Sequence, residues 1–209
     1  MLLSLLFSDP ALFIVWVIAI VFGITVHEFA HAFAAYKMGD NTAKYLGRLT
    51  LNPLKHMDVM GFLMLVLVGF GWGKPVPFNP YNLKYKKFGP ALVAIAGPLA
   101  NLISLVIFGL VLRSIITYAG LGGENLFVQL IVFLVQLNLI LIIFNLLPIP
   151  PLDGSKVLYS ILPASKQNVV IFLEKYGIYI LLAVIVFGSS YLSWIFNYFY
   201  NIILNILVL

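Results

Sequence analysis

Five long apolar segments dominate the sequence, at about residues 10–37, 89–118, 125–147, 167–188 and 190–208. A helix needs about 20 apolar residues to cross the hydrocarbon core of a bilayer, so each segment is long enough to span a membrane. The chain is 63% hydrophobic and only 9% charged, whereas soluble domains carry about 25% charged residues. We therefore expect an all-α polytopic membrane protein with a single membrane-embedded domain over residues 1–209.

A sixth apolar segment, residues 57–71, is too short to span comfortably, and runs of this length are typical of re-entrant or interfacial elements. Basic, polar stretches flank it at 38–56 and 72–88. Within them, residues 43–51 and 72–80 alternate in polarity and contain glycine and proline, which predicts small β-hairpin-like loops. The positive-inside rule places both basic stretches in the cytoplasm, which holds only if the short segment dips into the membrane and returns, and we expect this re-entrant path.

This topology decides which segments can meet. The N-terminus lies outside the cell membrane, the segment 89–118 runs outward, and the segment 125–147 runs back inward. The residues after 147 then reach the same half of the membrane as the C-terminal part of the segment 10–37. A fully spanning 57–71 would instead leave them on opposite sides.

The first spanning segment contains His27-Glu28-Phe29-Ala30-His31. On a helix, an H-E-x-x-H pattern places two imidazoles one turn apart on the same face, with a carboxylate beside them. Each ionisable group at the centre of a spanning helix costs about 2.5 kcal/mol or more unless it is paired or binds a metal. The pattern favours a metal-dependent hydrolase that works below the membrane surface. A hydrogen-bonded polar cluster between helices is the structural alternative.

A catalytic zinc site usually has three protein ligands and keeps a fourth position for water. The chain has no cysteine, three histidines and seven acidic residues. His56 lies in a loop, where a headgroup contact and a role near the site entrance are both open. The acidic residues outside the motif fall in loops or at the ends of spans, with the exception of Asp153. Three prolines before Asp153 interrupt the helix and Gly154 permits a sharp turn, so Asp153 is the candidate third ligand.

Three patterns in this order resemble the site-2 protease family of intramembrane zinc metalloproteases. They are the H-E-x-x-H helix, Gly97-Pro98-Leu99-Ala100-Asn101, and N-x-x-P-x-P-x-x-D-G at residues 145–154. The segments Leu51–Asp58 and Phe78-Asn79-Pro80 are also similar to stretches of its bacterial and archaeal members. The similarity covers about residues 20–160. It implies a minimal type without PDZ or CBS domains, with a catalytic core at about 10–160 and C-terminal helices at about 167–209.

The resemblance implies one zinc ion per chain, held by His27, His31 and Asp153, with Glu28 as the catalytic base. The expected function is an intramembrane zinc endopeptidase that cuts single-span membrane proteins within or near their transmembrane segment, as in regulated intramembrane proteolysis. Its active site would open toward the cytoplasmic half of the bilayer. Asn145 and Asn101 are candidate donors to the oxyanion because they lie close to the motifs. An interhelical hydrogen bond is the alternative role for Asn101.

Other functions stay open at this point. A metal-ion or proton transporter also places ionisable groups inside the membrane, but the chain lacks paired repeats and a second set of such groups. A catalytically silent protein of the same fold would not need the intact Glu28. The basic residues suit topology and lipid headgroups better than nucleic acid. Asn197, Asn201 and Asn205 form a stripe that suits helix packing or a homodimer face.

Overall fold

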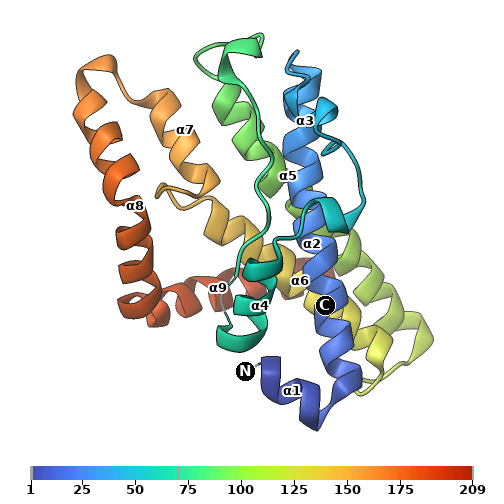
Figure 1. The fold of residues 1–209 in the computed structure, drawn as a ribbon. Coiled ribbons are helices and arrows are strands. Elements are labelled where there is room, and N and C mark those ends of the chain that lie inside the picture. The colour runs from blue at the N-terminus through green and yellow to red at the C-terminus, as the bar shows by residue number, and fades with distance from the viewer. Residues whose placement is uncertain (1, 70, 209) are drawn as a thin grey trace.

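Five long helices form the framework of the protein in the computed structural model, which describes residues 2–69 and 71–208 (Figure 1). These helices are α2 (Pro10–Lys37), α5 (Gly89–Ser114), α6 (Leu126–Asn145), α8 (Gln167–Phe187) and α9 (Ser189–Ile203). Together with the short turns that extend some of them, all five are long and apolar enough to cross a membrane. The prediction of an all-α protein with five helices of spanning length is confirmed.

Short elements connect these helices. In the described part of the chain, the short α-helices are α1 (Leu2–Ser8), α3 (Thr42–Tyr45), α4 (Val59–Val68) and α7 (Asp153–Ile161). Single 3-10 turns occur at η1 (Pro53–Lys55), η2 (Pro80–Asn82) and η4 (Ala164–Lys166). The π-helical turns η3 (Ile115–Ala119) and η5 (Leu204–Val208) extend α5 and α9.

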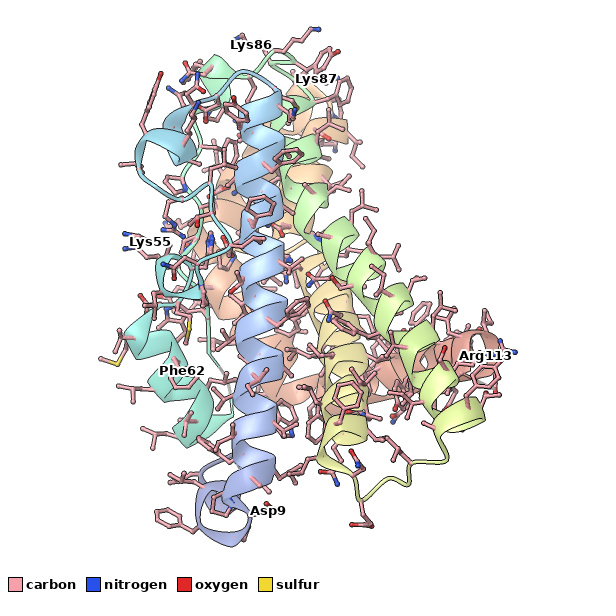
Figure 2. The ribbon with its side chains drawn as sticks, turned by 90° about the vertical axis from the view of Figure 1, so that its right-hand side faces the viewer. Asp9, Lys55, Phe62, Lys86, Lys87 and Arg113 are labelled. Atoms are coloured by element: carbon pink, nitrogen blue, oxygen red, sulfur yellow. The ribbon has the colours of Figure 1, made fainter. Side chains whose placement is uncertain are left out.

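The 28-residue helix α2 crosses the whole bundle and carries the H-E-x-x-H motif. Asp9 caps its start by accepting a hydrogen bond from the Leu12 N–H at 3.0 Å. Pro10 occupies the first turn, where its missing N–H leaves no hydrogen bond unmade. Figure 2 shows Asp9 at one end of the bundle and Lys86 and Lys87, just before α5, at the other. Helices α2 and α5 are therefore antiparallel neighbours.

Helices α2, α5 and α6 pack on one another and form the core of the bundle. Small residues on α2 let the neighbouring helices approach closely, as is common between spanning helices. Ala32 and Ala35 are fully buried. A side chain at Gly23 would lie only 3.0 Å from Leu137 and 3.1 Å from Leu141 of α6. This close packing gives the motif helix a fixed position against α5 and α6.

Helices α8 and α9 lie outside this core. In Figure 1, α8 stands at the edge of the bundle and α9 runs across the other helices. At Gly177, α8 comes so near the loop before α7 that an added Cβ would lie 2.7 Å from the Pro150 carbonyl oxygen. Helix α9 packs Phe196 and Tyr200 against buried residues of α5 and α6.

The segment around α4 leaves the bundle and returns to its starting point. Asp58 caps α4 by accepting a hydrogen bond from the Gly61 N–H at 2.8 Å. Beyond the helix the chain turns back, so that Met57 and Gly73 form an antiparallel bridge. In Figure 2, Phe62 of α4 lies beyond Lys55 in the direction of Asp9. The chain therefore returns beside the point where the segment begins, and the re-entrant position of the segment in the membrane stays a prediction.

The hairpins expected at 43–51 and 72–80 are not formed. Among the described residues the Met57–Gly73 bridge is isolated, and no β-strand is assigned. The first stretch starts as helix α3 and then turns at Gly47, whose φ is 66°. The second stretch contains three prolines, which lack the N–H that a ladder requires. Alternating polarity was a misleading signal here because local turns and prolines prevent strand pairing.

Asp40 joins the end of α2 to the loop at η2. Its fully buried carboxylate accepts hydrogen bonds from the Thr42 hydroxyl (2.6 Å), the Asn79 N–H (2.7 Å) and the Asn82 side-chain amide (3.0 Å). The Thr42 N–H also donates to it, at 3.1 Å. Burial raises the pKa of Asp40, but these hydrogen bonds outweigh burial and hold the pKa below its ordinary value.

We expect the substitution Asp40→Asn to lower the free energy of unfolding by about 2 kcal/mol, because an NH₂ group would face donors that need an acceptor. For a chain of this size, the melting temperature should fall by about 6 °C at pH 7. The stabilisation by the carboxylate is complete above the ordinary aspartate pKa of 3.8 and is lost as the pH falls through the lower folded value. Thermal unfolding in detergent should therefore show a difference between the two proteins that narrows below pH 3.8. Equal melting temperatures at pH 7 would contradict this role.

Candidate metal centre

The motif residues of α2 face the interior of the bundle about ten residues before the end of that helix, which corresponds to about 15 Å along its axis. His27 and His31 lie one helical turn apart, and both are buried. Glu28, between them in sequence, is only partly buried. This arrangement follows from the spacing of the motif on a regular helix.

Asp153 enters the same region from the junction between α6 and α7. Helix α6 ends at Asn145, and Asp153 is the first residue of α7. Gly154 packs directly against the carbonyl oxygens of Leu146 and Leu147, where no side chain would fit. This close contact brings the start of α7 against the end of α6 and directs the Asp153 carboxylate toward α2.

Three side-chain atoms then form a nearly equilateral triangle. The Nε2 atoms of His27 and His31 are 3.0 Å apart. The Oδ2 atom of Asp153 lies 3.2 Å from the first and 3.1 Å from the second. Ligand atoms at about 2.0–2.2 Å from a tetrahedral zinc ion are separated by about 3.3 Å, so the triangle has the dimensions of a zinc site.

Hydrogen bonds on the far side of each imidazole determine which nitrogen faces the triangle. The Nδ1 atom of His31 lies 2.8 Å from the Val93 carbonyl oxygen, which can only accept, so Nδ1 carries the proton. The Nδ1 atom of His27 lies 2.6 Å from Asn101 Oδ1. The Asn101 amide N–H₂ group donates to the Gly23 carbonyl and to Asn138, which identifies Oδ1 as the acceptor for His27. In their neutral forms, both imidazoles therefore present the Nε2 lone pair to the triangle.

This protonation pattern explains why the residues fit a metal ion. Two imidazole lone pairs and a carboxylate oxygen converge within 3.2 Å. The buried Oδ2 atom of Asp153 accepts no hydrogen bond from the described residues. Buried acceptors without donors are costly, whereas a divalent cation would satisfy all three atoms at once. Imidazole nitrogen and carboxylate oxygen are common zinc ligands, and three of them leave one coordination position open.

Gly97 of α5 forms the wall behind the two imidazoles. An added Cβ at this position would lie 2.5 Å from His31 Nε2 and 2.6 Å from His27 Cε1. Only a residue without a side chain leaves space for both rings. Sequence reasoning noted the motif that contains Gly97 but assigned no role to this residue. Its spacing of four from Asn101, which contacts His27, is the signal that places both on one face of α5.

Glu28 lies beside the triangle without forming one of its corners. Its Oε2 atom accepts a hydrogen bond from the Val76 N–H at 3.0 Å. Through Val76, the segment 73–77 that follows the return from α4 is therefore joined to the carboxylate next to the histidines. Sequence reasoning did not predict this contact.

The other candidate site residues, Asn101, Asn145 and His56, have different surroundings in the structure. Asn101 is fully buried, and both its oxygen and its N–H₂ group are engaged in hydrogen bonds behind His27. Asn145, at the end of α6, donates one N–H to the Leu141 carbonyl at 2.9 Å, which leaves its second N–H as a donor. His56 is fully buried and lies 2.7 Å from the Thr50 carbonyl oxygen through Nε2. It is not among the grouped metal-ligating residues, which are His27, His31 and Asp153.

Comparison with known families decides the affiliation of this chain. The model of peptidase family M50 matches residues 15–188, which include all three corners of the triangle. The chain belongs to peptidase family M50. As a member of this site-2 protease family, it is a zinc metalloprotease, and its five apolar helices are those of a multi-pass membrane protein.

Individual relatives of this M50 protein come from bacteria and archaea. YwhC of Bacillus subtilis (strain 168) is 40% identical over 183 residues, which cover 85% of this chain and 83% of YwhC. Rip2 of Mycolicibacterium smegmatis is 30% identical over 199 residues, or 92% of this chain and 74% of Rip2. MJ0611 of Methanocaldococcus jannaschii is 30% identical over 168 residues, or 75% and 77%. All three carry provisional names as zinc metalloproteases. No solved structure shows a significant match to the chain.

Proposed function

We propose that this protein is an intramembrane zinc endopeptidase that cuts membrane-anchored proteins within or near their transmembrane segment. The triangle of His27, His31 and Asp153 beside Glu28, inside a bundle of membrane-spanning length, is the observation that carries the proposal. The site lies about 15 Å along α2 from the end of that helix. A peptide bond must therefore reach it below the membrane surface.

The residues around the triangle have distinct roles in this proposal. Zinc held by His27, His31 and Asp153 would lower the pKa of its water to about 7 and polarise the scissile carbonyl. Glu28 accepts the proton of the attacking water and returns it to the leaving amine. Asn101 holds His27 in the tautomer that directs Nε2 inward. Asn145, with its unengaged N–H, is our candidate donor to the oxyanion.

The proposed orientation places the active site in the cytoplasmic half of the cell membrane and the N-terminus outside. Lys86 and Lys87 lie just before α5, at the end of the bundle opposite Asp9 (Figure 2). The Lys84 N–H donates to the Met38 carbonyl at the C-terminal end of α2, which places Lys84 at the same end. Arg113 lies toward the Asp9 end. The excess of basic residues at the end where α2 finishes favours a cytoplasmic location for that end.

We propose single-span membrane proteins as substrates, in the manner of regulated intramembrane proteolysis. The test is to reconstitute the purified protein in liposomes with a tagged single-span protein and to locate the cut by mass spectrometry. We expect cleavage within or next to the spanning segment, loss of cleavage on zinc chelation, and recovery on addition of zinc. An uncleaved spanning protein with the zinc-loaded enzyme would contradict the proposal.

The same liposomes test the transporter alternative. Sealed vesicles with zinc or a proton gradient on one side would show flux if the His/Glu/Asp cluster serves a transport path. We expect no flux above that of empty vesicles. Flux without proteolysis would replace the protease proposal.

We also propose a homodimer through the C-terminal helices. Asn197, Asn201 and Asn205 are exposed on α9 and its extension. Amide groups exposed to lipid gain hydrogen bonds when a second copy packs against them. Cross-linking in liposomes should capture dimers of the wild type and fewer of Asn201→Leu, and equal yields would contradict this interface.

A further inference from the structure

Arg48 is a buried cation that the proposed chemistry does not use. Only 6% of the residue is exposed, and its backbone N–H donates to the Ala43 carbonyl at 2.8 Å. Gly47 directly before it has a φ of 66°, a conformation that glycine adopts without strain. This tight turn after α3 directs Arg48 toward the interior. Burying a guanidinium costs free energy unless polar partners stabilise it, so the groups that Arg48 contacts indicate its structural role.

The guanidinium of Arg48 binds the segment that lies beside the catalytic carboxylate. One terminal nitrogen donates to the carbonyl oxygen of Lys74. The Lys74 N–H in turn donates to the His56 carbonyl at 2.8 Å. The backbone of Lys74 is therefore held on both its donor and its acceptor side, by two parts of the chain that precede α4.

Two residues further along, the same segment holds Glu28. The Val76 N–H donates to Glu28 Oε2 at 3.0 Å. Its neighbours Pro75 and Pro77 have fixed φ angles and no N–H, so the segment is stiff and has few alternative hydrogen bonds. The bond to Oε2 orients the carboxylate and leaves Oε1 to exchange a proton with water.

The charge of Glu28 acts on the Arg48 guanidinium. Burial lowers the pKa of the Arg48 guanidinium, and the negative charge of Glu28 opposes this shift. The two groups are thus within electrostatic range of each other, although they form no direct ion pair among the described residues.

We propose that Arg48 is a positioning residue for the catalytic base: it fixes residues 73–77 through Lys74, and these residues fix the Glu28 carboxylate through Val76. The inference rests on the proposed role of Glu28. It predicts that loss of the guanidinium slows the chemical step without removing zinc, because no hydrogen bond or ion pair within the described residues joins Arg48 to the triangle of ligands.

The test compares wild type, Arg48→Met, Arg48→Lys and the control Lys55→Met. Lys55 is an exposed cation in the same connection between α3 and α4, so its loss changes the net charge equally. For Arg48→Met we expect kcat to fall by about 10- to 100-fold with KM within about twofold and zinc content unchanged. Arg48→Lys should recover part of kcat because an ammonium also donates to the Lys74 carbonyl. Lys55→Met should match the wild type.

A second measurement follows the 73–77 segment directly and does not depend on activity. The chain has no cysteine, so a single Val76→Cys reports how often this segment opens. We expect the thiol to react faster with a maleimide when Arg48→Met is added than when Lys55→Met is added.

Each failure has a separate meaning. Unchanged kcat in Arg48→Met, a loss of zinc that parallels the loss of kcat, or equal thiol reactivity in the two backgrounds would overturn the positioning role. Absence of proteolysis in the wild type would instead contradict the proposed function, while the thiol measurement would still test the contacts of Arg48.

Discussion

Replacing Asp153 with asparagine is expected to remove both zinc and proteolytic activity from the purified protein. The Oδ2 atom of Asp153 is one of three converging acceptors, and it supplies the only negative charge in the triangle. An amide is a weaker ligand and does not offset the charge of the cation. Loss of an outer partner of a metal site costs about 10- to 100-fold in affinity or activity, so loss of a ligand should cost at least about 100-fold.

Zinc per chain by elemental analysis and the cleavage rate of a single-span substrate measure this prediction. Glu124→Gln is the matched control, because Glu124 is an exposed acid in the loop between α5 and α6. The control should keep both zinc and activity. If Asp153→Asn retained one zinc ion per chain and cleaved at the wild-type rate, Asp153 would not be a ligand.

The second large effect is expected from Gly97→Ala, a change of one methyl group. The new Cβ would lie 2.5 Å from His31 Nε2 and 2.6 Å from His27 Cε1, so at least one imidazole must move. Displacement of reacting groups by about 1 Å costs about 100-fold in rate. We therefore expect zinc binding and cleavage to fall nearly as far as in Asp153→Asn. The loss would come from displacement of the imidazoles, because position 97 supplies no ligand in either protein.

Gly109→Ala is the control for this prediction. It introduces the same residue into the same helix, where the nearest atoms belong to the flexible Leu207 side chain at 2.9 Å. Both variants gain about 1 kcal/mol of helix propensity, so only the location of the methyl group differs. Zinc content and activity of Gly109→Ala should resemble the wild type. Wild-type zinc binding by Gly97→Ala would show that the wall formed by α5 is not essential.

Features that repeat with the period of a helix were predictable from the sequence. His27 and His31 lie on one face of α2 because they are four residues apart, and charge parity indicated that the residues after 147 would return to them. The spanning helices were equally clear because their length and composition admit few alternatives. In each case the spacing of residues on a helix and the requirement to cross a bilayer predict the same structure.

Features that depend on contacts between distant segments were not predictable. The alternating residues of 43–51 indicated a strand, but helix α3 and the turn at Gly47 replace it. The hydrogen bond from Val76 to Glu28 joins residues 48 positions apart, and no sequence motif predicts it. Asn101 was predictable only in part. Its sequence motif marked it as a candidate site residue, but its contact with His27 depends on how α5 packs on α2, which the sequence does not specify.

Zinc content and cleavage, measured on the same preparations of wild type and Glu28→Gln, test the central claim most directly. Glu28 lies beside the triangle and not in it, so both proteins should hold about one zinc ion per chain. Loss of a general base typically costs about 10²–10⁴ in rate, and we expect cleavage by the variant to fall by that factor. Zinc-loaded Glu28→Gln that cleaves at the wild-type rate would contradict the assignment of Glu28 as the catalytic base.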